Sequence, residues 1–283
     1  MTRWNVVLTG IPRSGTTLAC YLLNQLPDTV ALHEPMEPQA LAALGSRDRA
    51  CAEIRRFFEE TRRSLRAEGS AVSKHIGGRV PDNPIADRAG GSGLRESLVS
   101  KAAIRIDKEL SEGFLLVVKH PSMFTAMLDR LVQRFPAYAV IRNPLAVLAS
   151  WNSVALAVQA GHAPAAEAFD DALARTLGTL TDRIERQLCL LSWFFERYSR
   201  VLSPGCVVRY EELVASGGKA LAVITPAAQG LSDTLEERNL NRLYDRRTML
   251  TLAERLLRAP GAYWEFYSRE SVERLARELA PAQ

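Results

Sequence analysis

The sequence predicts an α/β fold: a P-loop-like parallel sheet of about five strands flanked by helices, with helical insertions. Two observations lead to this prediction. Near the N-terminus an apolar run, a glycine turn, a helical segment and a second apolar run follow one another within about 30 residues, as in a strand–helix–strand unit. Further along, continuous apolar runs alternate with helical segments, and such runs are typical of strands covered on both faces.

The first unit begins with a predicted strand at residues 6–9, which stops at Gly10. A helical segment over 14–26 follows and ends at Pro27, because proline cannot continue a helix. A second strand is predicted over 29–32. The residues that end it are His33, Glu34 and Pro35.

The same alternation returns in the second half of the chain. Apolar runs predict strands at 114–118, 137–141 and 206–209. Apolar residues at helical spacing predict a helix over 122–135, and a proline near its first turn supports a helix over 144–151.

Helical insertions are expected at about 37–112 and 157–202 within a single domain that spans 1–283. In the first insertion, residues 47–68 are charged and periodic and predict a helix. Residues 69–93 are rich in Gly, Pro, Asp and Asn and are expected to form a long loop, which in a compact domain is usually functional or mobile.

Composition narrows the class of protein. The chain has 283 residues, a net charge of +4 and a pI of about 9.0, which suits an anionic small ligand and does not by itself indicate nucleic acid. No secretory leader precedes the first strand and no stretch approaches a membrane span, so we expect a cytoplasmic protein. The 4 cysteines are far apart, which favours reduced thiols over a metal site.

The strongest local pattern is residues 10–17, Gly-Ile-Pro-Arg-Ser-Gly-Thr-Thr, at the turn from strand to helix. Backbone N–H groups of such a loop and of the helix N-terminus bind anions. Gly10 and Gly15 match G-x-x-x-x-G-K-[ST], but Thr16 replaces the lysine and the cation lies at Arg13. A sulfuryl group carries less charge than a terminal phosphoryl group, so fixed cations and N–H donors can manage its transfer without magnesium. The loop therefore favours a phosphosulfate over ATP.

Two segments resemble the sulfotransferases that use 3′-phosphoadenosine-5′-phosphosulfate (PAPS). Residues 12–18, Pro-Arg-Ser-Gly-Thr-Thr-Leu, look like their 5′-phosphosulfate loop. Residues 140–150 resemble their 3′-phosphate segment, in which an arginine that ends a strand is followed eight residues later by a serine; Arg142 and Ser150 fit this spacing. The resemblance covers the sheet and its loops. It implies PAPS as co-substrate, adenosine 3′,5′-bisphosphate (PAP) as product, and no protein-bound metal.

Within this family the catalytic base differs between branches. Tyrosylprotein sulfotransferases and some bacterial carbohydrate sulfotransferases carry a glutamate after the second strand, and Glu34 lies 21 residues after Arg13. Lys119 also fits that branch, in Val-Lys-His-Pro after the third strand. Small-molecule sulfotransferases use a histidine after the third strand, which corresponds to His120. The arginine in the loop favours Glu34, and His120 stays the alternative.

The resemblance also implies roles. Glu34 takes the acceptor proton, Arg13 and the loop stabilise the leaving phosphate, and Lys119 faces the sulfuryl oxygens. A late basic loop usually completes the 3′-phosphate site, and here Arg246 and Arg247 are possible substitutes. The predicted catalytic residues are Glu34, Arg13, Lys119 and His120, and the predicted nucleotide-binding residues are Arg13, Ser14, Gly15, Thr16, Thr17, Arg142, Ser150 and Tyr210, the last near the adenine.

Two other functions stay open. A degenerate P-loop kinase or nucleotide hydrolase would need a metal-binding Asp at a strand end, and none of the predicted strands ends in Asp. A binding protein for PAPS or PAP without catalysis is the second, although Arg13, Glu34 and Lys119 together argue against it. The acceptor, whether small molecule, carbohydrate or lipid, and the oligomeric state are left open, and no nucleic-acid partner is expected.

Overall fold

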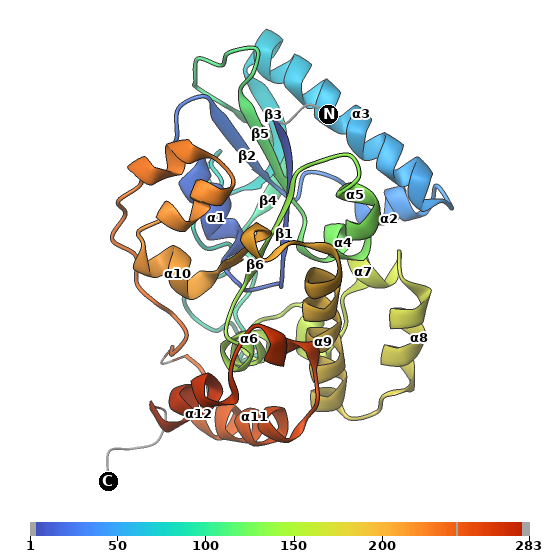
Figure 1. The fold of residues 1–283 in the computed structure, drawn as a ribbon, viewed down its shortest axis with the longest axis vertical. Coiled ribbons are helices and arrows are strands. Elements are labelled where there is room, and N and C mark those ends of the chain that lie inside the picture. The colour runs from blue at the N-terminus through green and yellow to red at the C-terminus, as the bar shows by residue number, and fades with distance from the viewer. Residues whose placement is uncertain (1–3, 242, 279–283) are drawn as a thin grey trace.

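A five-stranded sheet forms the centre of the molecule (Figure 1), in a computed structural model that describes residues 4–241 and 243–278. Each pair of neighbouring strands is parallel, and the strand order is β2-β5-β1-β6-β7. The predicted α/β fold with a parallel sheet of five strands flanked by helices is confirmed. The strands are β1 (Asn5–Gly10), β2 (Thr29–His33), β5 (Leu115–Lys119), β6 (Ala137–Ile141) and β7 (Val207–Arg209).

The sheet is covered on both faces. Every residue of β1, β2 and β5 is buried, and side chains from these strands enter two separate apolar clusters. Val7 belongs to one cluster and its neighbour Val6 to the other, because successive side chains of a strand point to opposite faces. This double burial explains why the strands read as continuous apolar runs.

The strand order places the functional edge of the sheet. From the central β1, the chain continues to β2 and β5 on one side and to β6 and β7 on the other. In open parallel sheets, ligands bind outside the carboxyl ends of the strands, where the order reverses in this way. The residues that end β1, β2, β5 and β6 therefore meet at one edge.

Helices surround the sheet (Figure 1). The long helix α3 starts at the cap Ser46, whose side chain accepts a hydrogen bond from the Arg49 N–H, and covers the residues predicted for it. The helices are α1 (Thr16–Leu23), α2 (Pro38–Ala42), α3 (Arg47–Glu68), α4 (Pro121–Ala126), α5 (Leu128–Leu131), α6 (Pro144–Trp151), α7 (Pro164–Glu167), α8 (Asp171–Thr179), α9 (Arg183–Val201), α10 (Tyr210–Ala215), α11 (Arg246–Arg258) and α12 (Arg269–Glu278).

The loop predicted over 69–93 differs from the structure in its first part. Strand β3 (Ser70–His75) pairs with β4 (Ser100–Arg105) in an antiparallel two-stranded sheet. Small and charged residues hide its period of two, although Ala71 and Ser73 are buried. The strand docks on β2, where the N–H of His33 donates to Ser73 Oγ over 3.0 Å.

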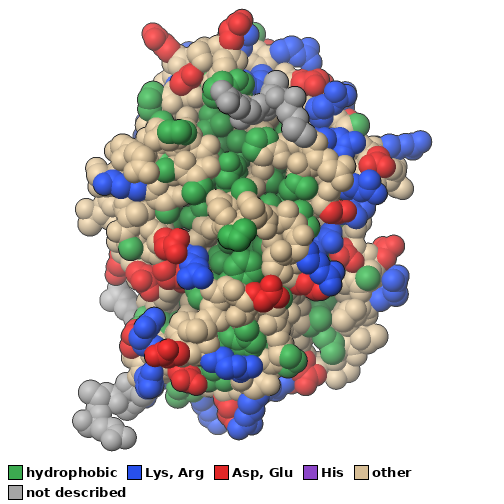
Figure 2. All heavy atoms as spheres, viewed as in Figure 1, with side chains coloured by type: hydrophobic (Ala, Val, Ile, Leu, Met, Phe, Trp, Pro, Cys, Tyr) green, Lys and Arg blue, Asp and Glu red, His purple; other side chains and the backbone are tan. Residues whose placement is uncertain are grey.

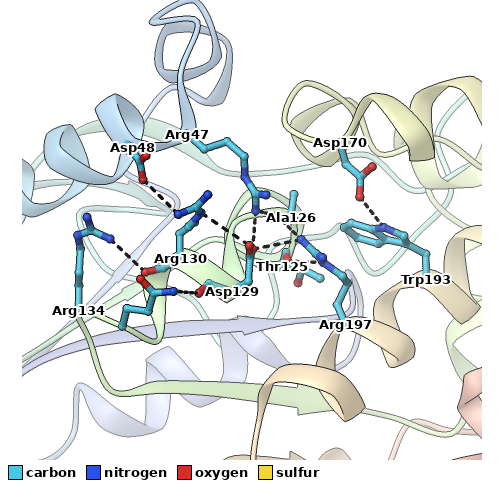
Figure 3. Close-up of polar contacts among 11 residues, drawn as sticks. Arg47, Asp48, Thr125, Ala126, Asp129, Arg130, Arg134, Asp170, Trp193 and Arg197 are labelled. Atoms are coloured by element: carbon cyan, nitrogen blue, oxygen red, sulfur yellow. Dashed lines mark hydrogen bonds and ion pairs between the residues drawn. The ribbon is translucent and has the colours of Figure 1, made fainter.

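The single helix predicted over 122–135 is also wrong. Helices α4 and α5 replace it, because Met127 leaves the helical conformation at φ −101° and ψ 7°. Two arginines, Arg47 and Arg197, hold this turn. They contact Asp129 and the carbonyl groups at the end of α4 (Figure 3).

Asp129 joins α3, α5 and α9 (Figure 3). Arg47 Nη2 lies 2.5 Å from Asp129 Oδ1 and also donates to the Ala126 carbonyl over 2.6 Å. Arg197 Nη2 reaches the same two groups over 3.4 and 2.6 Å. The last carbonyl groups of a helix lack partners within it, so these arginines satisfy the end of α4. This network holds in place the helix that follows β5.

The surface carries mixed charge. On the face shown in Figure 2, Lys and Arg side chains lie among Asp and Glu side chains around the rim, and hydrophobic side chains are visible in the middle. The positive charge on this face is therefore dispersed. Within the described ranges, no helix has both the length and the apolar character that crossing a bilayer requires.

Candidate functional site

A cavity of about 840 Å³ lies at the carboxyl edge of the sheet. Residues that follow each of the five strands contribute to its wall, as the parallel arrangement requires. Ser14 and Ser150 are buried beside it, and the other predicted residues line it directly. These lining residues are Arg13, Gly15, Thr16, Thr17, Glu34, Lys119, His120, Arg142 and Tyr210.

The loop after β1 has the backbone of an anion-binding turn. Gly10 has φ 147°, and a Cβ there would lie 2.4 Å from the Val140 carbonyl oxygen, so only glycine fits against β6. Arg13 has φ 74°, a conformation that residues other than glycine adopt mainly at functional sites and tight turns. No side chain caps the N-terminus of α1 at Gly15, which leaves its first N–H groups facing the cavity.

Ser14 has a structural contact. Its hydroxyl donates to the Val140 carbonyl over 2.6 Å, so the side chain ties the loop to β6. The Trp151 indole also donates to the loop, at the Pro12 carbonyl over 2.8 Å. Loop geometry thus depends on contacts from β6 and α6 as well as on its glycines.

Glu34, Lys119 and Thr17 form one network at the ends of β2 and β5 and in the first turn of α1. Lys119 Nζ lies 2.9 Å from Glu34 Oε1 and 3.4 Å from Thr17 Oγ1, and its side chain is only 3% exposed. The other carboxylate oxygen, Oε2, lies 2.5 Å from Lys74 Nζ. Glu34 has φ 46° and its N–H donates to the Lys119 carbonyl over 2.8 Å. The structure therefore brings together three residues that are far apart in the sequence.

The charge state of Glu34 follows from these neighbours. Burial by itself raises the pKa of the carboxyl, but Lys119, the hydrogen bond with His33 and Lys74 together hold that pKa well below its ordinary value. Glu34 is therefore ionised at neutral pH. It is also a weak base for as long as both lysines bind it.

The two histidines next to this network are neutral. Burial lowers the pKa of His120 to about 3 and that of His33 to about 4. His120 Nε2 accepts a hydrogen bond from the Met36 N–H over 3.1 Å, which occupies the lone pair that a base would use. His33 Nε2 lies 3.4 Å from Glu34 Oε1.

Arg13 connects the two segments that resemble nucleotide-binding motifs. Its Nε donates to Ser150 Oγ over 3.3 Å, and its Nη2 donates to Asn83 Oδ1 over 3.3 Å. The guanidinium thus lies toward α6, and the Arg13 side chain is not part of the network of Glu34, Lys119 and Thr17. Burial lowers the pKa of Arg13 to about 10, and the arginine stays charged at neutral pH.

Arg142 is held in a fixed orientation. Its Nε donates to Asn239 Oδ1 over 2.7 Å and its Nη1 to the Arg13 carbonyl over 3.0 Å. The guanidinium stacks on the Tyr210 ring at 4.5 Å. The same ring lies against Gly15, where a Cβ would be 2.7 Å from it. Tyr210 therefore packs between the loop and Arg142.

Several charged residues of the cavity were missed by the sequence analysis. Arg95 is 4% exposed, and its Nη2 donates to Ser153 Oγ over 2.7 Å; among the described residues its buried Nε has no partner. Arg238 also lines the cavity, whereas Arg246 and Arg247 are exposed outside its wall. No sequence motif marks the missed residues, because the β3–β4 sheet and loops bring them in from outside the five-stranded sheet. They are Lys74, Asn83, Arg95, Lys101, Arg238 and Tyr244.

Tyr244 lies among the arginines. Burial raises the pKa of its hydroxyl, but Arg142, a hydrogen bond with Ser150, Arg13 and Arg95 lower it more, and the net pKa is below the ordinary value. This shift indicates a strongly positive environment. Of the residues that the structure describes, no group of three or more His, Cys, Asp or Glu side chains could hold a metal ion.

Comparisons with known proteins do not identify a family for this chain. No protein-family model matches the chain, and no curated protein matches it in sequence. A solved structure of sulfotransferase STF1 from Mycobacterium tuberculosis H37Rv aligns over 97% of this chain and 76% of that chain, with 14% identity and a TM-score of 0.33. At this TM-score the likeness carries no weight for the function of the chain.

Proposed function

We propose that the protein is a sulfotransferase that transfers a sulfuryl group from PAPS to a hydroxyl or amine of an acceptor. The observation that carries this proposal is the position of Lys119 Nζ, within 3.4 Å of Thr17 Oγ1 and 2.9 Å of Glu34 Oε1. One buried cation thus joins an anion-binding loop to a carboxylate. Transfer of an anionic group needs this combination of loop, cation and base.

The residues present suit a ligand with two anionic ends. At one end are the uncapped N-terminus of α1 and Lys119. At the other end are Arg142, Arg13 and Arg95, and the buried Nε of Arg95 has no partner in the part of the chain that the structure describes. A group of buried cations with few counter-charges is costly unless an anion joins it. PAPS has its phosphosulfate at one end and its 3′-phosphate at the other.

Each residue then has a role. When bound, PAPS supplies an activated sulfuryl group on a phosphate leaving group. Glu34 takes the proton of the acceptor nucleophile, and Lys119 donates to the anionic oxygens that face it. Thr16, Thr17 and the N–H groups of the loop donate to the leaving phosphate. Arg142 and Ser150 bind the 3′-phosphate, and Tyr210 lies beside the adenine.

Glu34 is preferred to His120 as the base for a geometric reason. His120 Nε2 already accepts the Met36 N–H, and taking a proton there would leave that buried N–H unpaired. Glu34 faces the cavity and one of its two lysines, Lys74, is 36% exposed and free to change partner. Release of Lys74 would raise the pKa of Glu34 and make the carboxylate a stronger base.

Calorimetric titration with PAP, with ADP as control and EDTA present, tests the proposal. PAP is expected to bind at least about tenfold more tightly than ADP, since its 3′-phosphate, which ADP lacks, meets Arg142 and its neighbours. If ADP or ATP bind more tightly, and only with magnesium, the sulfotransferase proposal is wrong and the kinase or hydrolase alternative takes its place.

A further inference from the structure

Two lysines of the β3–β4 sheet face the cavity from directly opposite positions. Lys74 pairs with Lys101 in the antiparallel register, and both line the cavity wall. Opposite residues of such a pair have Cα atoms about 5 Å apart. Like charges at these positions weaken strand pairing, so nearby negative charge is needed to hold both ammonium groups there.

The protein itself supplies only part of that charge. Lys74 pairs with Glu34 and Lys101 with Glu37. Glu34 is shared with Lys119, so three lysines meet two carboxylates. The Glu37 side chain is 63% exposed, and an exposed ion pair of this kind contributes little.

Other charges at this end do not restore the balance. His33 and His120 are neutral at pH 7 because burial lowers the pKa of each. Asp87 interacts with Arg95, and Asp82 accepts the N–H of Asn83, whose side chain binds Arg13, so both acids lie among residues that contact the arginines. The acceptor end of the cavity therefore keeps an excess of positive charge beside Glu34.

Apolar side chains also line this end. Met36 follows Glu34, Met123 comes from the first turn of α4, and Val158 and Ala163 come from the segment after α6. All four line the same cavity as the two lysines. A matching ligand has an apolar body and one charged end.

We propose that the acceptor is a small anionic molecule whose carboxylate or similar group is bound jointly by Lys74 and Lys101, while its apolar body lies along the methionine side of the cavity. This inference rests on the proposed function, because it names the acceptor of that site. It also explains the exposed position of Lys74. On acceptor binding, Lys74 leaves Glu34 Oε2 for the anion, and that oxygen becomes available to the acceptor proton.

Three related phenols test the proposal: 4-hydroxyphenylacetate, 4-hydroxyphenylacetamide and tyramine. They share the 4-hydroxybenzyl group and end in a carboxylate, a neutral amide and an ammonium group. Each is titrated into the protein saturated with PAP, and binding is followed by NMR. The anion is expected to bind at least about tenfold more tightly than either of the others. Lys74→Gln and Lys101→Gln should each remove most of this preference, and Lys219→Gln, at an exposed lysine of the segment Lys219–Val223, should leave it unchanged.

The outcomes distinguish failure of the proposed function from failure of the anionic acceptor. If PAP itself does not bind, the proposed function fails. If PAP binds but the anion has no advantage, or keeps its advantage in both lysine variants, the anionic acceptor is wrong and the sulfotransferase proposal stands. Circular dichroism of each variant shows whether the β3–β4 sheet and the rest of the fold persist, and Lys74→Arg, which keeps the charge, should retain the preference.

Discussion

The two ends of the cavity are built in different ways. The nucleotide end consists of strand ends and the loop of a parallel sheet, with Arg142 directly after β6 and Thr17 in the first turn of α1. The acceptor end is built by the inserted β3–β4 sheet, which brings Lys74 and Lys101 to Glu34. The first end depends mainly on the sheet, to which loops add Arg95 and Arg238. The second depends on how an insertion docks on it, and that is where acceptor choice can vary without change to donor binding.

The largest effect is expected where the two ends meet. Glu34→Gln should lower kcat by about 10²–10⁴-fold, since a positioned general base contributes this much, and should change the Kd of PAP by less than about threefold. Transfer of labelled sulfur from PAPS to the best acceptor of wild type measures the first effect, and calorimetry measures the second.

Glu112→Gln serves as the control for this experiment. Glu112 is exposed and pairs with Arg66, far from the cavity wall, so both constants should match wild type. Turnover of Glu34→Gln equal to that of wild type would mean that Glu34 is not the base and would return attention to His120. Binding of PAP without any transfer by wild type would instead favour the non-catalytic binding protein.

The next effect concerns the nucleotide end alone. Arg142→Ala should raise the Kd of PAP by about 30- to 100-fold, the usual loss for a charged pair with phosphate, while the Kd of ADP changes little. Arg246→Ala, at an exposed arginine outside the cavity, should bind PAP as wild type does. Equal losses in both variants would place the 3′-phosphate elsewhere than at Arg142.

A smaller effect is expected for the contacts of Asp129, which hold the turn between α4 and α5. Asp129→Ala should lower the free energy of unfolding by about 1 kcal/mol, because its partners Arg47 and Arg197 are partly exposed and keep their contacts with Ala126. Urea denaturation measures this. Asp107→Ala, at an exposed pair with Arg105, should cost almost nothing, and an equal loss there would contradict the role of Asp129.

The smallest effect is expected in how the free energy of unfolding changes with pH. The folded pKa of Glu34 lies below its ordinary value of 4.5, so the unfolded chain binds this proton first as pH falls. The stability that ionised Glu34 contributes is complete above the ordinary pKa and is lost as pH falls through the folded pKa. Unfolding of wild type and Glu34→Gln, compared at about pH 6 and at lower pH, should converge toward the acidic end. A constant difference would show that the carboxylate is not held by its lysines.

The sequence by itself determined the parallel sheet and the residues at its edge. Continuous apolar runs identify doubly covered strands, and parallel strands end at one edge, so Glu34, Lys119 and Arg142 had to lie near the loop at Arg13. These inferences are local in origin. The roles of these residues stay predictions, as does the description of the chain as a single domain.

Only the tertiary structure decided the rest of the site. Lys74 and Arg95 lie in an insertion that mostly lacks an apolar pattern, and Arg238 and Tyr244 lie outside helices and strands. The residues around them in the sequence therefore do not predict which way these side chains point. Their positions follow from long-range contacts, such as the hydrogen bond from the His33 N–H to Ser73 Oγ. Periodicity reports which face of an element is buried, whereas the partner of a loop depends on the packing of the whole chain.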